Sequence, residues 1–348
     1  MPDRLQFGLI GSGSQGRFLS EALRMTEKAD LIACADPNEE ATQRAIAQCG
    51  YQTAFSSAAE LLDQADLDAV IVATIHDQLQ PMALAAVNAG KHVFVEKPMA
   101  LNAADGRELV AAASEANVRL MVGYTLRFMP ERMLMKQLLD EGAIGDISHA
   151  AAGQCIGFSR DHWLNDPKHG GGPLFYIGSH ALDNALWMIG REPTRIFADV
   201  YWPDQKHAEA GVDALITFDD GLSLHACASY RSGCSYGWLD LIGTEGRMRS
   251  EWQSNKLYIE SRNIPAYNQP TELAVPLQPY IPPLPGSAAA SVVTFRYLPM
   301  WAAEMHEFIA AITAGREPSV TGADGVRFLE VADAIFASAR TGQPVRLT

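Results

Sequence analysis

A glycine-rich turn near the amino terminus restricts the fold of this chain more than any other feature. The run Gly11-Ser12-Gly13-Ser14-Gln15-Gly16 directly follows the apolar stretch Phe7–Ile10 and opens an amphipathic one. Gly11 permits a tight bend, Gly13 lets the backbone approach a pyrophosphate, and Gly16 lets helix and strand pack closely. A glycine turn alone is common, but a strand before it and a helix after it are the context of a dinucleotide-binding site, with helix N–H groups facing the phosphates.

An acidic residue stands about twenty residues beyond the turn, where a second strand is expected to end. Asp36 is placed to accept hydrogen bonds from the adenosine ribose hydroxyls. Glu39 and Glu40 add negative charge and no Arg or Lys is close to receive a 2′-phosphate, so NAD(H) is favoured over NADP(H). Asp36 could also cap the helix that begins near Glu39, and both interpretations can hold together.

Strand and helix patterns alternate through the first third of the chain. Short runs that are apolar on both faces, separated by amphipathic stretches, indicate a doubly wound parallel sheet with its ligand beyond the carboxyl ends of the strands. The expected strands are Phe7–Ile10, Leu31–Ala35, Ala69–Ala73, His92–Val95 and Arg119–Val122. The expected helices are Gly16–Met25, Glu39–Gln48, Pro81–Asn88 and Ala104–Ala116.

The pattern changes after Tyr124, and 348 residues usually form more than one core. We expect a dinucleotide-binding domain over residues 1–125 and an α+β domain with a large, mainly antiparallel open sheet over residues 126–348. Asp219-Asp220-Gly221 predicts a hairpin, and Ile264–Pro285 a surface excursion. The expected helices are Glu131–Glu141, Leu174–Ile189, Pro299–Thr313 and Gly325–Arg340, and the strands are Ile147–Cys155, Arg195–Tyr201, Asp213–Phe218, Leu222–Tyr230, Gly237–Ile242 and Arg247–Glu251.

Composition excludes several classes of partner. The formal net charge of −14 argues against a nucleic acid or an anionic membrane surface. Five scattered cysteines, no secretory signal and no apolar stretch long enough to span a bilayer fit a cytoplasmic protein with reduced thiols. Asp161, His162 and His169 are too loosely spaced to indicate a metal site, so we expect none.

A second motif, Glu96-Lys97-Pro98, follows directly after a buried strand. Because that strand ends at the ligand edge, Lys97 is expected to point towards the nicotinamide, and Pro98 restricts the geometry before it. A lysine there can act as an acid or base, or donate a hydrogen bond to a substrate oxygen. Standing alone, the motif would be better explained by a surface lysine.

Together these residues resemble the glucose–fructose oxidoreductase, inositol dehydrogenase and MocA family (Gfo/Idh/MocA). The resemblance spans the chain and includes Gly11–Gly16, Asp36, Ala89–Pro98, Val122–Pro130, Gly142–Ile147, Gly170–Leu174, Gly178–Asp183, Phe308–Gly315 and Val331–Val345. It implies a Rossmann domain and a C-terminal α+β domain whose open sheet often makes dimer or tetramer contacts. Typical members move a hydride between a nicotinamide and a hydroxyl-bearing carbon of a sugar, an inositol or a related cyclic diol.

The resemblance also assigns roles to single residues. Lys97 matches the catalytic lysine, His180 the catalytic histidine, and Asp183 a residue that can contact substrate hydroxyls; without the family, His180 would be taken for a core histidine. Residues expected to bind the cofactor are Gly11, Ser12, Gly13, Ser14, Gln15, Gly16, Asp36, Thr74, His76, Glu96 and Lys97. Residues expected to bind substrate are Lys97, Tyr124, Arg127, Trp163, Tyr176, His180 and Asp183. Arg127 could equally brace the interdomain hinge, and the loop around Trp163 could be ordinary surface.

Two departures from the family pattern affect these expectations. Many members carry Asp where this chain has Tyr176, and a phenol cannot raise the basicity of the histidine by charge. Tyr176 could instead donate a hydrogen bond to the reacting oxygen, or fill space. After Ala69–Ala73, Ile75, His76 and Leu79 also replace the usual residues, and His76 could contact the nicotinamide ribose or lie on the surface.

The expected function is therefore an NAD-dependent dehydrogenase for a cyclic polyol, sugar, inositol or glycoside, bound between the two domains, with Lys97, His180 and Tyr176 catalytic. One alternative keeps tightly held NAD for transient use in hydrolysis or epimerisation, or senses a sugar without chemistry. Another is oxidation of a dihydrodiol derived from an aromatic ring.

Overall fold

The computed structural model describes residues 4–158, 162–252, 254–275 and 292–347. The chain forms two compact units. The first comprises Met1–Phe128 and Gln278–Val326, and the second comprises Met129–Leu277 and Arg327–Thr348. The sequence pattern does not reveal that the chain returns to the first unit.

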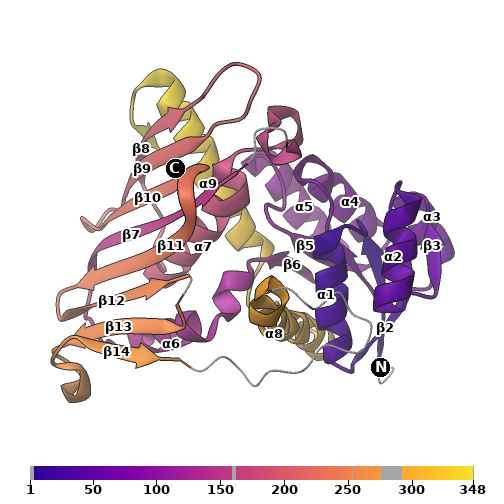
Figure 1. Ribbon diagram of the computed structural model, residues 1–348, viewed down its shortest axis with the longest axis horizontal. Helices are drawn as coiled ribbons and strands as arrows, with labels where there is room; N and C mark the ends of the chain where they lie inside the picture. The colour runs from indigo at the N-terminus through magenta and orange to yellow at the C-terminus, as the bar shows by residue number, and fades with distance from the viewer. Residues whose placement is uncertain (1–3, 159–161, 253, 276–291, 348) are drawn as a thin grey trace. The chain divides into compact units, whose positions relative to one another are not determined.

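In the described part of the first unit, six parallel strands form a sheet in the order β3-β2-β1-β4-β5-β6. The order reverses between β1 and β4, and such a switch point is where doubly wound sheets bind ligands. The strands are β1 (Leu5–Ile10), β2 (Ala29–Ala35), β3 (Thr53–Phe55), β4 (Ala69–Val72), β5 (His92–Glu96) and β6 (Leu120–Gly123). The connecting helices are α1 (Ser14–Met25), α2 (Glu39–Cys49), α3 (Ala58–Gln64), α4 (His76–Asn88) and α5 (Ala103–Glu115) (Figure 1).

A helix from far along the chain completes the core of this unit. In α8 (Val292–Ala314), Trp301 stacks on Phe18 of α1 with ring centroids 5.3 Å apart. The buried Phe308 meets Phe7 of β1 and Phe94 of β5 edge-on, at 6.2 and 5.9 Å. The dinucleotide-binding sheet is therefore covered in part by a helix that follows the second unit in sequence.

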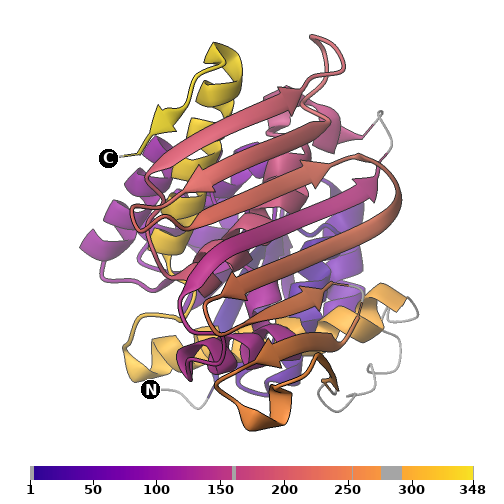
Figure 2. The same ribbon diagram turned by 90° about the vertical axis from the view of Figure 1, so that its left-hand side faces the viewer.

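In the described part of the second unit, nine strands form a mainly antiparallel sheet in the order β14-β13-β12-β11-β7-β10-β9-β8-β15. Among the described strand pairs of this second sheet, only β7 and β10 pair in parallel. Figure 2 shows these strands side by side. They are β7 (Ile147–Gly157), β8 (Arg195–Tyr201), β9 (Gly211–Thr217), β10 (Ser223–Ser229), β11 (Arg231–Gly243), β12 (Gly246–Glu251), β13 (Lys256–Ser261), β14 (Thr271–Ala274) and β15 (Val345–Arg346).

Helices cover one face of this sheet. α6 (Pro130–Asp140) packs against β12 and β13, and α7 (Ser179–Ile189) against β7, β10 and β11. Near the end of α9 (Gly322–Thr341), the Ser338 hydroxyl accepts a hydrogen bond from the Ala198 N–H of β8 at 3.0 Å. On the other face, alternate residues of β8 and β9 are exposed, as a half-buried sheet requires. No helix in the described ranges has both the length and the apolar character needed to cross a bilayer.

The main elements agree with the sequence prediction, including the hairpin at Asp219-Asp220-Gly221, where Gly221 has a φ of 88°. Three details were predicted wrongly. The excursion Ile264–Pro285 contains β14 in its described part, because β13 offers it an antiparallel partner. α4 begins at His76 rather than Pro81, so Pro81 lies inside the helix although its ring removes one backbone donor. The short elements β3, α3, β13 and β15 escape prediction because their apolar patterns are too brief.

Candidate active site

The glycine turn has the geometry that a phosphate cradle needs. Gly11 has a φ of 94°, and a Cβ atom on it would collide with the Ala73 carbonyl at the end of β4. A Cβ on Gly16 would collide with the Gly11 carbonyl, whereas one on Gly13 would meet no described atom within 4 Å. Gly13 is the N-cap of α1 and no side chain caps this helix start. Its N–H groups are thus suited to an anionic ligand.

Asp36 lies at the end of β2, beside this turn. One carboxylate oxygen accepts from the Ser12 N–H and the other from the Asn38 N–H, both at 2.9 Å. Asn38, not Asp36, is the N-cap of α2, so the capping interpretation of Asp36 is wrong in detail. Each carboxylate oxygen can accept a further hydrogen bond, as ribose recognition would require. The sequence suggested that no Arg or Lys lies near this turn. In the structure, Arg17 donates to the Ser12 carbonyl at 2.9 Å.

Glu96 is the last residue of β5 and Lys97 follows it, and both are buried ionisable groups. Gln15 of α1 donates to Glu96 at 2.8 Å, which ties the glycine turn to this strand end. Burial lowers the pKa of Lys97 to about 8, although the adjacent Glu96 carboxylate opposes the change. Burial likewise raises the pKa of Glu96, against the effects of Lys97 and Gln15. Lys97 is therefore not the surface lysine that the motif alone would suggest.

Thr74 and His76 follow β4 at the same sheet edge. Thr74 lies directly against Gly11, since a Cβ on that glycine would also crowd the Thr74 methyl group. His76 is the first residue of α4 and is buried, so the surface interpretation of this histidine is wrong. The first unit thus gathers all of the predicted cofactor residues at the carboxyl edge of its sheet.

Tyr124 and Arg127 follow β6 and are both buried. The Arg127 guanidinium forms an ion pair with Asp324 at 3.0 Å and lies over the Tyr124 ring, 5.9 Å from its centroid. Although burial opposes ionisation, Arg127 and the hydrogen bonds from Thr321 hold the pKa of Asp324 below its usual value. Both partners of this ion pair belong to the first unit, so the hinge role and the substrate role of Arg127 both stay predictions.

In the second unit, the predicted catalytic side chains share one helical segment. A π-helical turn, η4 (Leu174–Gly178), runs directly into α7, and such turns are frequent at functional sites. Tyr176 lies on the turn, whereas His180 and Asp183 lie on α7. The spacing of four and then three residues keeps all three side chains near one face of a helix. Tyr176 and His180 are partly exposed and Asp183 is buried.

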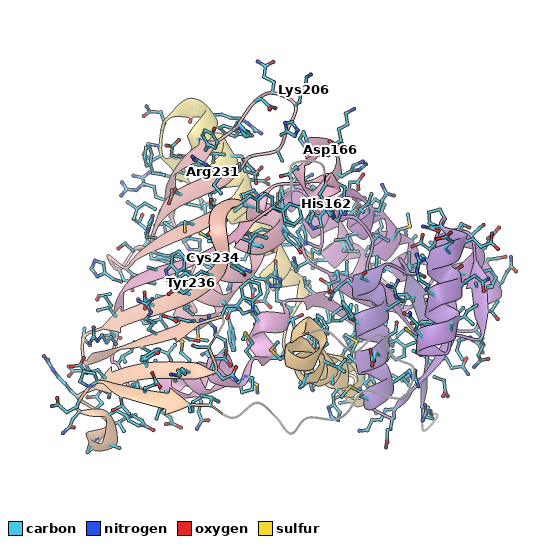
Figure 3. All side chains as sticks on the ribbon, in the orientation of Figure 1. His162, Asp166, Lys206, Arg231, Cys234 and Tyr236 are labelled. Carbon is cyan, nitrogen blue, oxygen red and sulfur yellow. The ribbon has the colours of Figure 1, made fainter. Side chains whose placement is uncertain are left out.

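The loop before this segment joins it through aromatic rings. Trp163 lies 5.8 Å from the His162 ring, His162 lies 5.0 Å from Phe158, and Phe158 lies 5.9 Å from Tyr176. Figure 3 labels His162 and Asp166 on this loop. Asp161 lies outside the described residues. Over the ranges that are described, no three His, Cys, Asp or Glu side chains are grouped as a metal site.

Sequence reasoning missed a buried acid in this unit. Glu209, in the loop between β8 and β9, accepts a hydrogen bond from the Leu174 N–H, and burial raises its pKa to about 7. No motif surrounds it in the sequence. The available signal was an isolated Glu between two strand patterns, which is also what an exposed loop contains.

Comparison with known proteins finds one family of oxidoreductases for both parts of the chain. Residues 5–124 match the model of an oxidoreductase family with an NAD-binding Rossmann fold, and residues 133–249 match the GFO/IDH/MocA C-terminal domain. The chain is 28% identical to inositol 2-dehydrogenase of Rhizobium meliloti, over 96% of each protein. It is 26% identical to scyllo-inositol 2-dehydrogenase (NAD(+)) of Bacillus subtilis, over 100% of this chain and 97% of that protein.

Among solved structures, levoglucosan dehydrogenase in complex with NADH and levoglucosan is similar, with a TM-score of 0.87 and 25% identity over 99% of both chains. The family matches cover both units, and the observed sheet order and glycine turn agree with them. The chain therefore belongs to the Gfo/Idh/MocA family of NAD-binding oxidoreductases.

Proposed function

We propose that this protein is an NAD-dependent dehydrogenase that oxidises a hydroxyl-bearing carbon of a sugar, inositol, glycoside or related cyclic polyol. The observation that carries the proposal is Lys97, a buried lysine at the ligand edge of the sheet whose pKa burial lowers to about 8. An amine that can lose its proton near neutral pH is suited to accept a hydroxyl proton. The relatives named above act on inositols and on levoglucosan, and these are the substrate classes to test first.

The residues present fit a bound NAD. The start of α1 with Gly13 would hold the pyrophosphate, and the Asp36 carboxylate would accept hydrogen bonds from the ribose hydroxyls. We favour NAD over NADP because a 2′-phosphate would be repelled by Asp36, even with Arg17 near the turn. When bound, the nicotinamide supplies hydride transfer.

The protein side chains would supply orientation and proton transfer. Neutral Lys97 takes the hydroxyl proton, and Glu96 beside it stabilises the resulting ammonium group. His180 assists this transfer, while Tyr176 donates a hydrogen bond to the reacting oxygen and Asp183 accepts hydrogen bonds from neighbouring hydroxyls. The aromatic faces of Trp163 and Tyr176 suit the apolar face of a sugar ring.

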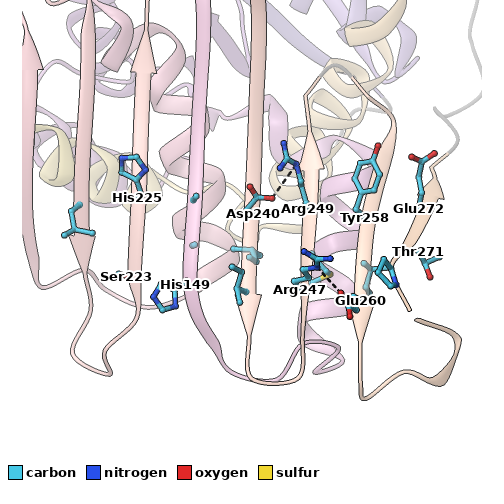
Figure 4. Close-up of a pocket in the computed structure, with 18 residues that line it drawn as sticks. His149, Ser223, His225, Asp240, Arg247, Arg249, Tyr258, Glu260, Thr271 and Glu272 are labelled. Carbon is cyan, nitrogen blue, oxygen red and sulfur yellow. Dashed lines mark hydrogen bonds and ion pairs between the residues drawn. The ribbon is translucent and has the colours of Figure 1, made fainter. Parts of the chain in front are cut away.

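We further propose a cytoplasmic homo-oligomer that assembles through the open face of the nine-stranded sheet. Phe197, Leu215 and Ile242 are exposed there. A groove of about 810 Å³ on this face is lined by charged side chains of both signs. Asp240 forms an ion pair with Arg249, and Glu260 forms one with Arg247 (Figure 4). Mixed charges suit an interface in which one surface meets its own copy. The five cysteines are free thiols, as a reducing compartment would keep them.

The test is to incubate the purified protein with NAD and a panel of inositols, sugars, glycosides and dihydrodiols while following NADH formation. We expect NADH with at least one polyol, and with NAD preferred to NADP. NADH from dihydrodiols alone would contradict the proposed substrate class. Non-exchangeable NAD in the purified protein with no net NADH on any substrate would favour transient cofactor use instead.

A further inference from the structure

A buried carboxyl group, that of Glu209, contacts the start of the helical segment that carries Tyr176 and His180. Glu209 is 3% exposed, and its Oε1 accepts from the Leu174 N–H at 3.1 Å. Leu174 is the first residue of η4, and its N–H is one of the donors that a helix start leaves without an internal partner. Glu209, which lies in a different loop, therefore supplies the hydrogen-bond acceptor for the first N–H group of this segment.

Gly172 provides the space in which the carboxyl group lies. A Cβ atom on Gly172 would be less than 3.0 Å from both oxygens and from the Cδ atom of Glu209. Its φ of 112° is also one that residues with side chains rarely adopt. The third glycine of the run Gly170–Gly172 is thus required by the acid as well as by the turn.

The Gly172 carbonyl group connects this turn to Tyr176. It accepts from the Tyr176 N–H at 3.2 Å and from the Tyr230 hydroxyl at 3.1 Å. Tyr230 in turn stacks on Phe158 at 4.9 Å and meets the Tyr176 ring edge-on at 6.4 Å. Displacement of the carboxyl group would therefore disturb both the backbone and the ring packing of Tyr176.

We propose that Glu209 is a positioning residue of the active site, whose carboxyl group fixes the turn at Gly172 and with it the segment that carries Tyr176 and His180. The inference rests on the proposed function, because Glu209 would act only through those two side chains. It adds to that function a role for Gly170–Gly172, which would help to hold the helical segment that carries the proposed catalytic residues.

The protonation state of Glu209 should change within the working range of an enzyme. Burial raises its pKa to about 7, and the Leu174 N–H and its own backbone N–H only partly oppose this. Tyr230, which directly follows β10, is a titratable group close to Glu209; burial raises the pKa of Tyr230, as do its neighbours Tyr176, on η4, and Glu209. The residue before Glu209 is bonded to the loop that carries Asn165, because the Ala208 N–H donates to the Asn165 carbonyl group at 2.8 Å. Since folding favours the protonated acid, the stability it contributes is full below the unfolded value near 4.5 and is lost as pH rises through about 7.

The experiment compares Glu209→Gln and Glu209→Ala with Glu192→Gln, which changes an exposed glutamate of the same unit. Glu209→Gln keeps an acceptor for the Leu174 N–H, so we expect kcat within about threefold of wild type. We expect Glu209→Ala to lower kcat about tenfold or more, with an unchanged KM for NAD, because the cofactor residues belong to the first unit. An unchanged kcat in Glu209→Ala would overturn the proposal.

If Glu209→Ala does not fold, the pH dependence of Glu209→Gln decides. We expect the thermal midpoint of the wild type and of Glu192→Gln to fall as pH rises from about 5 to 8, and that of Glu209→Gln to fall less. Equal pH dependence in all three proteins would overturn the inference. The thermal comparison needs no substrate. It therefore still tests the role of the Glu209 carboxyl group if the wild type forms no NADH and the proposed function fails.

Discussion

Lys97 and Glu209 are both buried ionisable groups beside a predicted functional segment, but the two units support them differently. Lys97 is adjacent to a full negative charge, Glu96, which opposes the effect of burial on its pKa. Glu209 has backbone N–H groups instead, and no charged side chain contributes to its shift. A counter-charge can keep a buried lysine able to hold or release a proton, whereas neutral donors leave a buried acid more stable when protonated. The first arrangement suits proton transfer, and the second suits structural support.

The sharpest test of this comparison is Lys97→Ala. Because a positioned general base contributes about 10²- to 10⁴-fold to a rate, we expect kcat/KM for polyol oxidation to fall by that factor. Lys91→Ala is the matched control, since Lys91 immediately precedes the same strand and donates to the Leu67 carbonyl group at 2.9 Å. NADH formation by both variants, with NAD-induced thermal shifts to check the fold, provides the measurement. A rate for Lys97→Ala near that of Lys91→Ala would remove Lys97 from the chemistry.

His180→Ala asks how much of the chemistry belongs to the second unit. Loss of a charge-assisted hydrogen bond in the transition state costs about 1.5–3 kcal/mol, so we expect kcat to fall about 10- to 100-fold. His207→Ala, in a loop of the same unit where His207 pairs with Asp204 at 2.8 Å, should keep the wild-type kcat. Steady-state kinetics with saturating NAD would measure both. Equal kcat values in the two variants would confine catalysis to the first unit.

The predicted site residues of the two units differ in how far the sequence alone could identify them. Gly11–Gly16 and Lys97 could be predicted because each immediately follows a strand whose apolar pattern fixes the sheet edge. Glu209 could not, because its burial depends on Gly172, which is distant in sequence, and on the pairing of β8 with β9. The ion pair of Arg127 with Asp324 is similar: the two residues lie 197 positions apart, and local patterns carry no information on such a contact. Local periodicity predicts elements, whereas a buried charge depends on tertiary partners.

The pH profile offers a smaller effect that separates the two groups. Neutral Lys97 is the proposed proton acceptor, and burial lowers its pKa to about 8. We therefore expect kcat/KM for oxidation to rise about tenfold per pH unit below 8 and to level off above it. Rates measured from pH 6 to 9.5 in a constant-ionic-strength buffer would show this limb. If the rate instead fell as pH rose through about 7, and this fall vanished in Glu209→Gln, the acid rather than the lysine would control the profile.

The smallest effect is expected at Asp36, a carboxylate that contrasts with Glu209 because it is partly exposed and accepts two backbone N–H groups. Asp36→Asn keeps the Asx geometry towards Asn38 but replaces one acceptor oxygen by an amide group. Weakened ribose hydrogen bonds should raise the KM for NAD about three- to tenfold, and loss of the negative charge should lower the KM for NADP. Arg17, which already donates to the Ser12 carbonyl, would then be the nearest cation available to a 2′-phosphate, so Arg17→Ala added to Asp36→Asn should reverse the gain for NADP. An Asp36→Asn variant that uses both cofactors as the wild type does would show that this carboxylate supports only the glycine turn.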